Sequence, residues 1–280
     1  MEIKNLENIG LARLTETINK TYGDYIIQLQ LTQQQVEKRN IALAVEPRLS
    51  AGVFDKGEFV GFLLHGIGSW GGQKALYNAM TGLLPAYRGK KLTLKMYEYL
   101  MPAIKESGAQ KIILEFIDGN DRAFKAYKSA GFEKSRGFIG MKGEIGPLKT
   151  NTDFIVKEVD NYDWQKLKSF WQWQPSWQNH IQAAENSKPD NVLLCAYAGN
   201  APAAYAILTP AANRVMQFAT AKEYRGRGAA SALFKHIADN YCKEITIINI
   251  DDRAKDISGF LARAGLKKNI SLTEMQLLLQ

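Results

Sequence analysis

The stretches TGLLPAYRGKKLTLKMYEYL (residues 81–100) and FATAKEYRGRGAASALFKHI (residues 218–237) carry the same features in the same order. In each, an apolar run leads into Tyr-Arg-Gly, and a segment with apolar residues at helical spacing follows. Tyr224 lies 137 residues after Tyr87, which is about half of the 280-residue chain. The pair therefore indicates an internal repeat.

The repeat extends outward on both sides of these stretches. Upstream, each copy has a hairpin pattern, with turns at residues 55–58 and at Gly199-Asn200. Downstream, KIILEFI (111–117) and EITIINI (244–250) read as strands, and a second helix ends at Gly131 or Gly265. We predict two mixed α/β domains, residues 1–145 and 146–280, joined by a linker at 143–153.

Composition places the chain among ordinary globular proteins, with 46% hydrophobic and 23% charged residues. Two cysteines and three histidines argue against a disulfide framework and against a metal site. The N-terminus shows no export signal, and we expect a cytoplasmic protein. Residues 192–212 are free of charge, but Gly199-Asn200 near the middle predicts a buried hairpin rather than a membrane span.

The net charge of +8 is shared by both halves and forms no basic tail. Such a diffuse positive charge favours an anionic ligand or a role in solubility over dedicated nucleic-acid binding. A place for an anion is the Arg-Gly loop in each half, because the first turn of a helix leaves backbone N–H groups unpaired. Glycine there lets the backbone approach a phosphate closely.

These residues resemble a known family. RGRGAA (225–230) is similar to the Arg/Gln-x-x-Gly-x-Gly/Ala loop of the GCN-related N-acetyltransferases (GNAT), which wraps the pyrophosphate of acetyl-coenzyme A (acetyl-CoA). LEFIDGNDRAFKAYKSAGF (114–132) resembles the strand–helix segment that follows in that family, and LLPAYRG (83–89) resembles the approach to its loop. The resemblance covers residues 50–142 and, more loosely, 190–267.

The resemblance implies two tandem GNAT-like domains that use acetyl-CoA as co-substrate. Tyr127 matches the family's general acid, and the strand before the loop would offer a backbone N–H to the thioester carbonyl near Gly82–Leu84. Glu115 is our candidate for the general base, acting through a water, and its alternative is a strand carboxylate paired with a lysine. His65 could serve as the base instead, but a lone histidine at such a position more often has a structural role. The cofactor-binding residues that we expect are Leu83, Leu84, Arg88, Gly89, Lys90, Lys91, Leu92, Thr93 and Asn120 in the first half, and Arg225, Gly226, Arg227, Gly228, Ala229 and Ala230 in the second.

The two halves depart from the family pattern in opposite ways. The first keeps Tyr127 but has lysines in its loop, whereas the second keeps the glycine loop but has Leu261 at the tyrosine position and Ala254 in place of Asn120. We therefore expect the first half to be catalytic, and the second to bind cofactor or to serve structurally. Four tryptophans in the second half predict either a buried contact or an aromatic wall for a ligand: Trp164, Trp171, Trp173 and Trp177.

Our hypothesis is an acetyl-CoA-dependent N-acetyltransferase that acts on a primary amine of a small molecule or peptide. The alternatives are a non-catalytic coenzyme A-binding or sensor protein and an aminoacyl-tRNA-dependent transferase. The sequence carries no signature of the acceptor and none of the oligomeric state.

Overall fold

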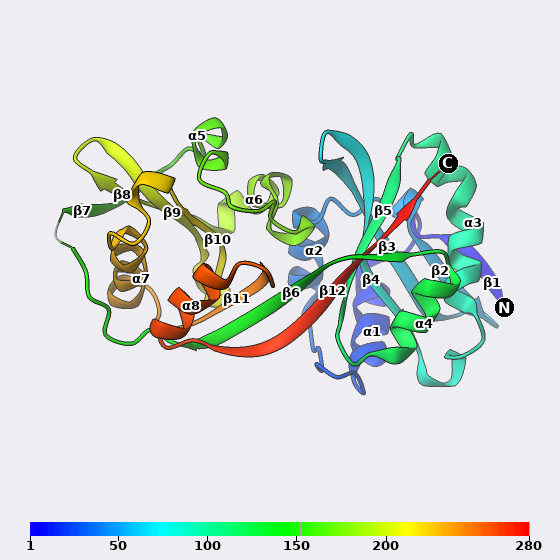
Figure 1. Cartoon of the computed structure of the whole chain (residues 1–280). Coiled ribbons are helices and arrows are strands. Elements are labelled where there is room, and N and C mark those ends of the chain that lie inside the picture. The colour runs from blue at the N-terminus through cyan, green and yellow to red at the C-terminus, as the bar shows by residue number, and fades with distance from the viewer. Residues whose placement is uncertain (152, 280) are drawn as a thin grey trace. The chain divides into compact units, whose positions relative to one another are not determined.

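The computed structural model describes residues 1–151 and 153–279, which form two compact units (Figure 1). Unit 1 contains residues 1–136 together with the C-terminal segment from Thr273, and unit 2 contains residues 137–272. These bounds differ from the halves 1–145 and 146–280 because two long strands each contribute to both units. These strands are β6 (Glu133–Glu144) and β12 (Lys267–Leu278).

Unit 1 is a mixed sheet with helices on both faces. Its strands follow the order β1-β2-β3-β4-β5, and the end of β12 lies beside β5. Only β4 and β5 pair in parallel within this series; the others are antiparallel. Its elements in chain order are β1 (Glu2–Asn5), α1 (Leu11–Tyr22), α2 (Gln33–Ala42), η1 (Pro47–Leu49), β2 (Ala51–Asp55), β3 (Glu58–Trp70), β4 (Gln73–Leu83), η2 (Pro85–Tyr87), α3 (Leu92–Glu106), β5 (Lys111–Ile117) and α4 (Asp121–Ser129).

The two faces of this sheet are covered by different helices. Leu63 packs in the cluster that α3 and α4 form with the strands, and this cluster includes Tyr127 and Met275. Phe62, the preceding residue on β3, points to the opposite face, where it lies close to Gly82 and Thr21 of α1. Met275 belongs to β12, so the C-terminal strand supplies core residues to the first unit.

Unit 2 repeats this plan. Its strands follow the order β6-β11-β10-β9-β8-β7, and β10 and β11 form the parallel pair. One face packs on α7 and α8 through residues such as Leu233 and Leu261, and the other packs on α5 and α6 through residues such as Leu167 and Ala184. Its elements are β7 (Phe154–Glu158), α5 (Trp164–Lys168), η3 (Trp177–Asn179), α6 (Ile181–Asn186), η4 (Lys188–Asp190), β8 (Val192–Ala198), β9 (Ala201–Thr209), η5 (Pro210–Ala212), β10 (Arg214–Thr220), η6 (Lys222–Tyr224), α7 (Ala229–Asn240), β11 (Glu244–Asp251) and α8 (Lys255–Arg263).

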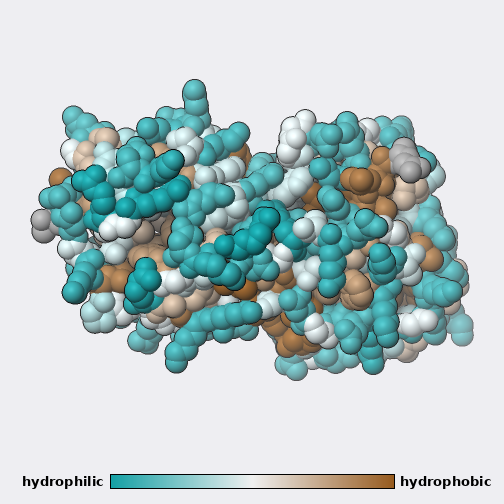
Figure 2. Space-filling model, viewed as in Figure 1, coloured by the Kyte–Doolittle hydropathy of each residue, from teal (hydrophilic) through white to brown (hydrophobic). Residues whose placement is uncertain are grey.

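The structure confirms the predicted repeat of elements. Both hairpins form, and Gly131 and Gly265 follow α4 and α8 with φ of 92° and 102°, a left-handed conformation that glycine adopts without strain. The uncharged residues 192–209 are the hairpin β8–β9. Among the described residues, no helix is long and apolar enough to cross a membrane. Hydrophilic residues cover most of the face seen in Figure 2, and hydrophobic residues appear there in scattered patches.

Candidate functional sites in the two units

In unit 1 the parallel strands β4 and β5 pair and then separate. Pairing runs from Ala75 to Asn78 on β4, opposite Lys111 to Leu114 on β5, and goes no further. At the point of separation Ala79 is an extra residue relative to β3, because Met80 pairs with Leu64 and Asn78 with His65. This bulge re-aims the end of β4 and opens the sheet edge that faces β5.

The opened edge offers one backbone donor near the predicted position. The N–H of Leu84 donates to the carbonyl of Val60 at 2.9 Å, so Leu84 faces β3 and cannot serve as the donor that we predicted. Successive N–H groups of a strand point to opposite sides, so the N–H of Leu83 faces the open edge. The predicted position of the backbone donor to the thioester carbonyl therefore narrows from Gly82–Leu84 to Leu83.

The Arg88–Thr93 loop includes the first two residues of α3, Leu92 and Thr93. Gly89 and Lys91 have φ of 75° and 56°, and Lys91 is the residue before the helix, with no side-chain cap on it. No side chain of the N-cap residue therefore occupies the first-turn N–H groups of α3, which leaves them available to an anion. Lys90 is exposed, and its ammonium lies 5.0 Å from the ring centre of Tyr87.

The side chain of Arg88 points away from this loop. Its guanidinium donates two hydrogen bonds to Asp24, at 2.6 and 2.7 Å, and others to the carbonyls of Leu83 and Thr21, each at 3.0 Å. Asp24 raises the pKa of Arg88, and the pKa of Asp24 is itself lowered by the hydrogen bond from Arg88. The Arg88 charge is thus already matched by a carboxylate, which disfavours the predicted side-chain contact with a phosphate.

Tyr127 lies at the inner end of the opening, on α4. Its side chain is buried, and it interacts with Thr81 and Asn78 of β4; Thr81 Oγ1 donates to Asn78 Oδ1 at 2.9 Å. Burial raises the pKa of Tyr127 to about 12, although the hydrogen bonds of Tyr127 with Thr81 and Asn78 act to lower it. The phenol is therefore protonated at neutral pH, as a general acid must be.

Asn120 joins this site as the N-cap of α4. Its side-chain oxygen accepts from the N–H of Ala123 at 3.1 Å, and its Nδ2 donates to the hydroxyl of Tyr25 at 2.8 Å. Tyr22 is nearby, and its hydroxyl donates to the carbonyl of Thr81 at 3.0 Å. These two tyrosines were missed by the sequence reasoning; the signal available was the turn Tyr-Gly-Asp-Tyr (22–25) after an amphipathic segment.

These residues surround a cavity of about 1130 Å³ in unit 1. Most of the predicted site residues of the first half line it: Leu83, Arg88, Gly89, Lys91, Leu92, Thr93, Asn120 and Tyr127. Leu84, Lys90 and Glu115 are not among the lining residues. The loop, the open strand edge and the tyrosine therefore meet in one space.

Neither candidate base faces this cavity. Glu115 lies on β5 between Leu114 and Phe116, and both of these pack in the cluster that contains Tyr127, so Glu115 points to the other face of the sheet. It already interacts with another group of the chain. His65 is completely buried, its Nδ1 lies 2.7 Å from the carbonyl of Leu49, and burial lowers its pKa to about 4. His65 therefore has the structural role that the sequence favoured for it, and it is closed off from the cavity where a base would act.

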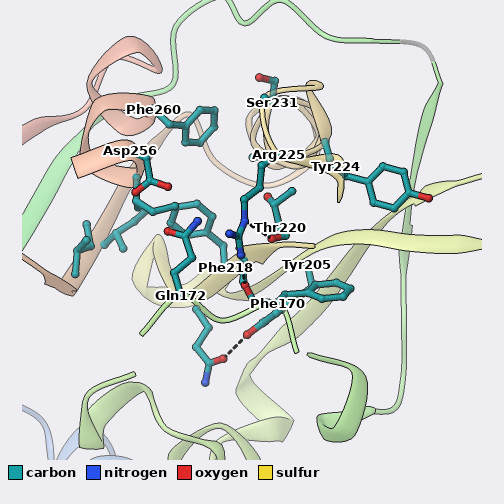
Figure 3. Close-up of a pocket in the computed structure, with 18 of the residues that line it drawn as sticks. Phe170, Gln172, Tyr205, Phe218, Thr220, Tyr224, Arg225, Ser231, Asp256 and Phe260 are labelled. Atoms are coloured by element: carbon teal, nitrogen blue, oxygen red, sulfur yellow. Dashed lines mark hydrogen bonds between the residues drawn. The ribbon is translucent and has the colours of Figure 1, made fainter. Parts of the chain in front are cut away.

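Unit 2 has the corresponding opening and a cavity of about 780 Å³ (Figure 3). Met216 is the extra residue of β10, at the same offset of 137 residues from Ala79, and the parallel pairing of β10 with β11 is confined to Arg214 and Thr246. Gly226 and Gly228 have φ of 71° and 98°. All six predicted loop residues line the cavity: Arg225, Gly226, Arg227, Gly228, Ala229 and Ala230.

The proton-donating side chains of unit 1 are replaced by apolar ones in unit 2. Leu261 occupies the position of Tyr127 and is fully buried, and Phe218 occupies that of Thr81. Ala254 precedes α8 and makes no side-chain cap, unlike Asn120. No residue at these positions can give a proton to a leaving group.

The tryptophans divide between the two roles that the sequence left open. Trp171 and Trp173 line the cavity of unit 2, and the indole of Trp171 donates to the hydroxyl of Tyr205 at 2.6 Å. Trp177 is buried, and Trp164 donates to Glu185 on α6. Figure 3 shows Phe170, Phe218 and Phe260 around the same cavity, so its walls are strongly aromatic.

Several solved structures share the fold over the whole chain. A GCN5-related N-acetyltransferase from Sphaerobacter thermophilus is 12% identical, with a TM-score of 0.70, over 99% of this chain and 95% of its own. A tandem GNAT protein from the clavulanic acid biosynthesis pathway is 11% identical, with a TM-score of 0.69, over 99% and 98%. A GCN5-related glucosamine N-acetyltransferase region of a fungal multi-domain GH3 β-N-acetylglucosaminidase is 16% identical, with a TM-score of 0.71, over 99% and 38%. At these identities the likeness shows the fold alone.

No curated protein matches the chain significantly. A sequence model of the acetyltransferase (GNAT) family does match, over residues 13–132 and again over residues 158–254. The first match ends just after α4 of unit 1, and the second runs from the last residue of β7 to the residue before α8 in unit 2. Two matches in series, on two units with the same order of elements, show that the chain is a tandem member of the acetyltransferase (GNAT) family.

Proposed function

We propose that the protein transfers the acetyl group of acetyl-CoA to a primary amine of a small molecule or peptide, and that unit 1 carries the reaction. The observation that carries this proposal is the protonated, buried Tyr127 at the end of a cavity that reaches the Arg88–Thr93 loop. The alternatives, a coenzyme A sensor and an aminoacyl-tRNA-dependent transferase, have no comparable observation in their favour.

The cofactor would enter with its pyrophosphate against the start of α3. The N–H groups from Gly89 to Thr93 would bind the phosphate oxygens, and Lys91, at the mouth of the cavity, would add positive charge. The thioester would then lie along the open edge of β4, where the N–H of Leu83 stabilises the negative charge that develops on the carbonyl oxygen.

Tyr127 acts on the leaving group. The neutral amine attacks the thioester carbon, the carbon–sulfur bond breaks, and the thiolate takes the phenolic proton as coenzyme A leaves. The amine loses one proton to solvent or to a base, and Tyr127 regains its proton from solvent. Glu115 as that base, acting through a water, is a separate hypothesis, and Glu115→Gln in the assay below tests it.

Unit 2 would bind a coenzyme A ester without turning it over. Its Arg225–Ala230 loop keeps both glycines, which supports phosphate binding, whereas Leu261 and Phe218 offer no proton. We therefore assign catalysis to unit 1 and cofactor binding to unit 2.

The test is Tyr127→Phe, assayed for acetyl-CoA turnover against a panel of primary amines. We expect kcat to fall by about 10²–10⁴-fold, the usual contribution of a positioned acid, with the affinity for coenzyme A unchanged by calorimetry. Tyr99→Phe is the matched control, because Tyr99 lies on α3, is 45% exposed and does not line the cavity. Full activity of Tyr127→Phe would overturn the assignment, and absence of wild-type turnover with every amine would favour the sensor.

A further inference from the structure

The arginine at the start of each loop makes the same two backbone contacts in both units. Arg88 Nε donates to the carbonyl of Leu83 and one of its terminal nitrogens to that of Thr21, each at 3.0 Å. Arg225 Nε donates to the carbonyl of Thr220 and a terminal nitrogen to that of Phe170, each at 3.1 Å. In Figure 3 the Arg225 side chain runs inward from the loop toward Phe170. Both arginines thus connect the end of the opened strand to the C-terminal end of the first helix of the unit: Thr21 lies in the last turn of α1, and Phe170 lies just after α5.

Unit 1 adds a carboxylate to this arrangement. Asp24 accepts two hydrogen bonds from Arg88, at 2.6 and 2.7 Å, and lies in the cavity loop, which we define as residues 23–32 between α1 and α2. Arg225 has no ion pair with a carboxylate in the described part of the chain. The ion pair therefore distinguishes the unit that keeps Tyr127.

The cavity loop is held at its base and at Tyr25. Asn19 and Leu31 exchange two hydrogen bonds, of 2.9 and 2.8 Å, which close the loop at its base. The hydroxyl of Tyr25 accepts from Asn120, the cap of α4, at 2.8 Å. Asp24, Tyr25 and Ile26 line the cavity, so the position of this loop sets the shape of the space beside Tyr127.

The contacts of Arg88 also reach the proposed thioester site. The carbonyl that its Nε holds belongs to Leu83, the residue whose N–H faces the open edge of β4. Holding that carbonyl restricts the backbone of Leu83 and hence the direction of its N–H. One side chain thus contacts both Leu83, the proposed backbone donor to the thioester carbonyl, and Asp24 of the cavity loop.

We propose that Arg88 is a positioning residue that couples the thioester end of β4 to the cavity loop through Asp24, and is not a ligand of the pyrophosphate. This inference rests on the proposed function of unit 1. It predicts that Arg88 and Asp24 control the affinity for the amine, which would lie between the loop and Leu83. The phosphates would be bound by the backbone of the Gly89–Thr93 loop alone.

The two roles are separated by Arg88→Gln, Asp24→Asn and the double variant in the full-length protein. We expect each to raise KM for the amine about tenfold or more, the usual effect of losing hydrogen bonds to a charged group, and to leave the dissociation constant of coenzyme A within about twofold. Because both changes break the same Arg88–Asp24 contact, the double variant should raise KM for the amine no more than Arg88→Gln does. Arg48→Gln is the control: its pair with Glu106 is also an Arg–carboxylate contact, at 2.8 Å, but neither residue lines the cavity.

A phosphate ligand would give the opposite result. Arg88→Gln would then weaken coenzyme A binding severalfold, and Asp24→Asn would leave the amine KM unchanged; either finding overturns the proposal. If the wild type acetylates no amine, the proposed function fails. Amide hydrogen exchange at residues 23–32 then tests whether Arg88 holds the cavity loop through Asp24. Exchange should be faster in Arg88→Gln and Asp24→Asn than in the wild type and Arg48→Gln. Equal rates in all four proteins would overturn the positioning role of Arg88.

Discussion

The buried imidazole of His65 shows how the surroundings of a residue decide between two roles of one residue type. A histidine near a predicted cleft suggests a base, but this ring is closed off from solvent and lies 5.5 Å from the ring centre of Tyr97. Its Nδ1 contacts the carbonyl of Leu49, and burial lowers its pKa to about 4. The residue is a neutral core side chain, and its titration affects stability instead of catalysis.

The expected consequence is a loss of stability in acid. Between about pH 4 and 6.5 the unfolded chain binds a proton at His65 that the folded chain does not, so the free energy of unfolding rises with pH across this window. The whole effect is about 3 kcal/mol. Urea unfolding of wild type and His65→Phe at several pH values measures it: the variant should show a flatter pH dependence from 4 to 6.5. Parallel pH profiles of the two proteins would contradict the prediction.

At the scale of single elements, α4 and α8 are each followed by a glycine with a left-handed backbone. Gly131 and Gly265 both have positive φ, but their surroundings differ. A Cβ at Gly131 would meet only the flexible end of Leu277, at 3.2 Å, whereas one at Gly265 would clash with the backbone oxygen of Glu144. The glycine after the helix therefore has room for a Cβ atom in unit 1 but not in unit 2.

This difference predicts unequal costs for the same substitution. Gly131→Ala should destabilise by about 1–2 kcal/mol, the strain of a left-handed non-glycine residue. Gly265→Ala should cost clearly more, because backbone must also move. Thermal and urea unfolding of the two variants provide the comparison, and equal costs would show that the surroundings of Gly265 relax.

Local patterns predicted the repeated elements well because each depends on neighbouring residues. The β8–β9 hairpin follows from Gly199-Asn200, and α4 follows from the cap at Asn120. Helices α1 and α2, which bring Asp24 and Tyr25 to the site, were not predicted individually. The directions of the Arg88 and Glu115 side chains could not be predicted from the sequence either. The direction of a side chain depends on distant contacts, such as that of Arg88 with Asp24, 64 residues away.

At the scale of the whole molecule, the chain returns to its first unit at the end. β12 brings Glu274 beside Ser135 and Arg136 of β6: the carboxylate accepts from Ser135 Oγ at 2.7 Å and from two nitrogens of Arg136 at 3.0 Å. The Arg136 and Glu274 side chains are only 13% and 6% exposed, and the guanidinium lies 5.4 Å from the ring centre of Trp70. This buried pair fixes the C-terminal strand in unit 1.

Removing one partner should be costly because it leaves a buried charge uncompensated. Glu274→Ala should lower the free energy of unfolding by about 3–5 kcal/mol, measured by urea unfolding with circular dichroism. The control is Glu244→Ala, which breaks the exposed pair with Lys142 (2.9 Å; side chains half exposed) and should cost about 1 kcal/mol or less. Similar costs for the two variants would mean that the buried pair does not hold β12.

The sequence by itself determined the repeat, the order of elements from the first hairpin to the second helix of each copy, and the glycine loops, because each of these elements depends on residues close together in the chain. It also indicated that Tyr127 is kept in one copy and lost in the other. Only the tertiary structure decided that Leu83, not Leu84, faces the open edge, that Arg88 turns to Asp24, and that residues from Thr273 complete unit 1. These depend on hydrogen bonds and packing between distant segments, which no local pattern encodes.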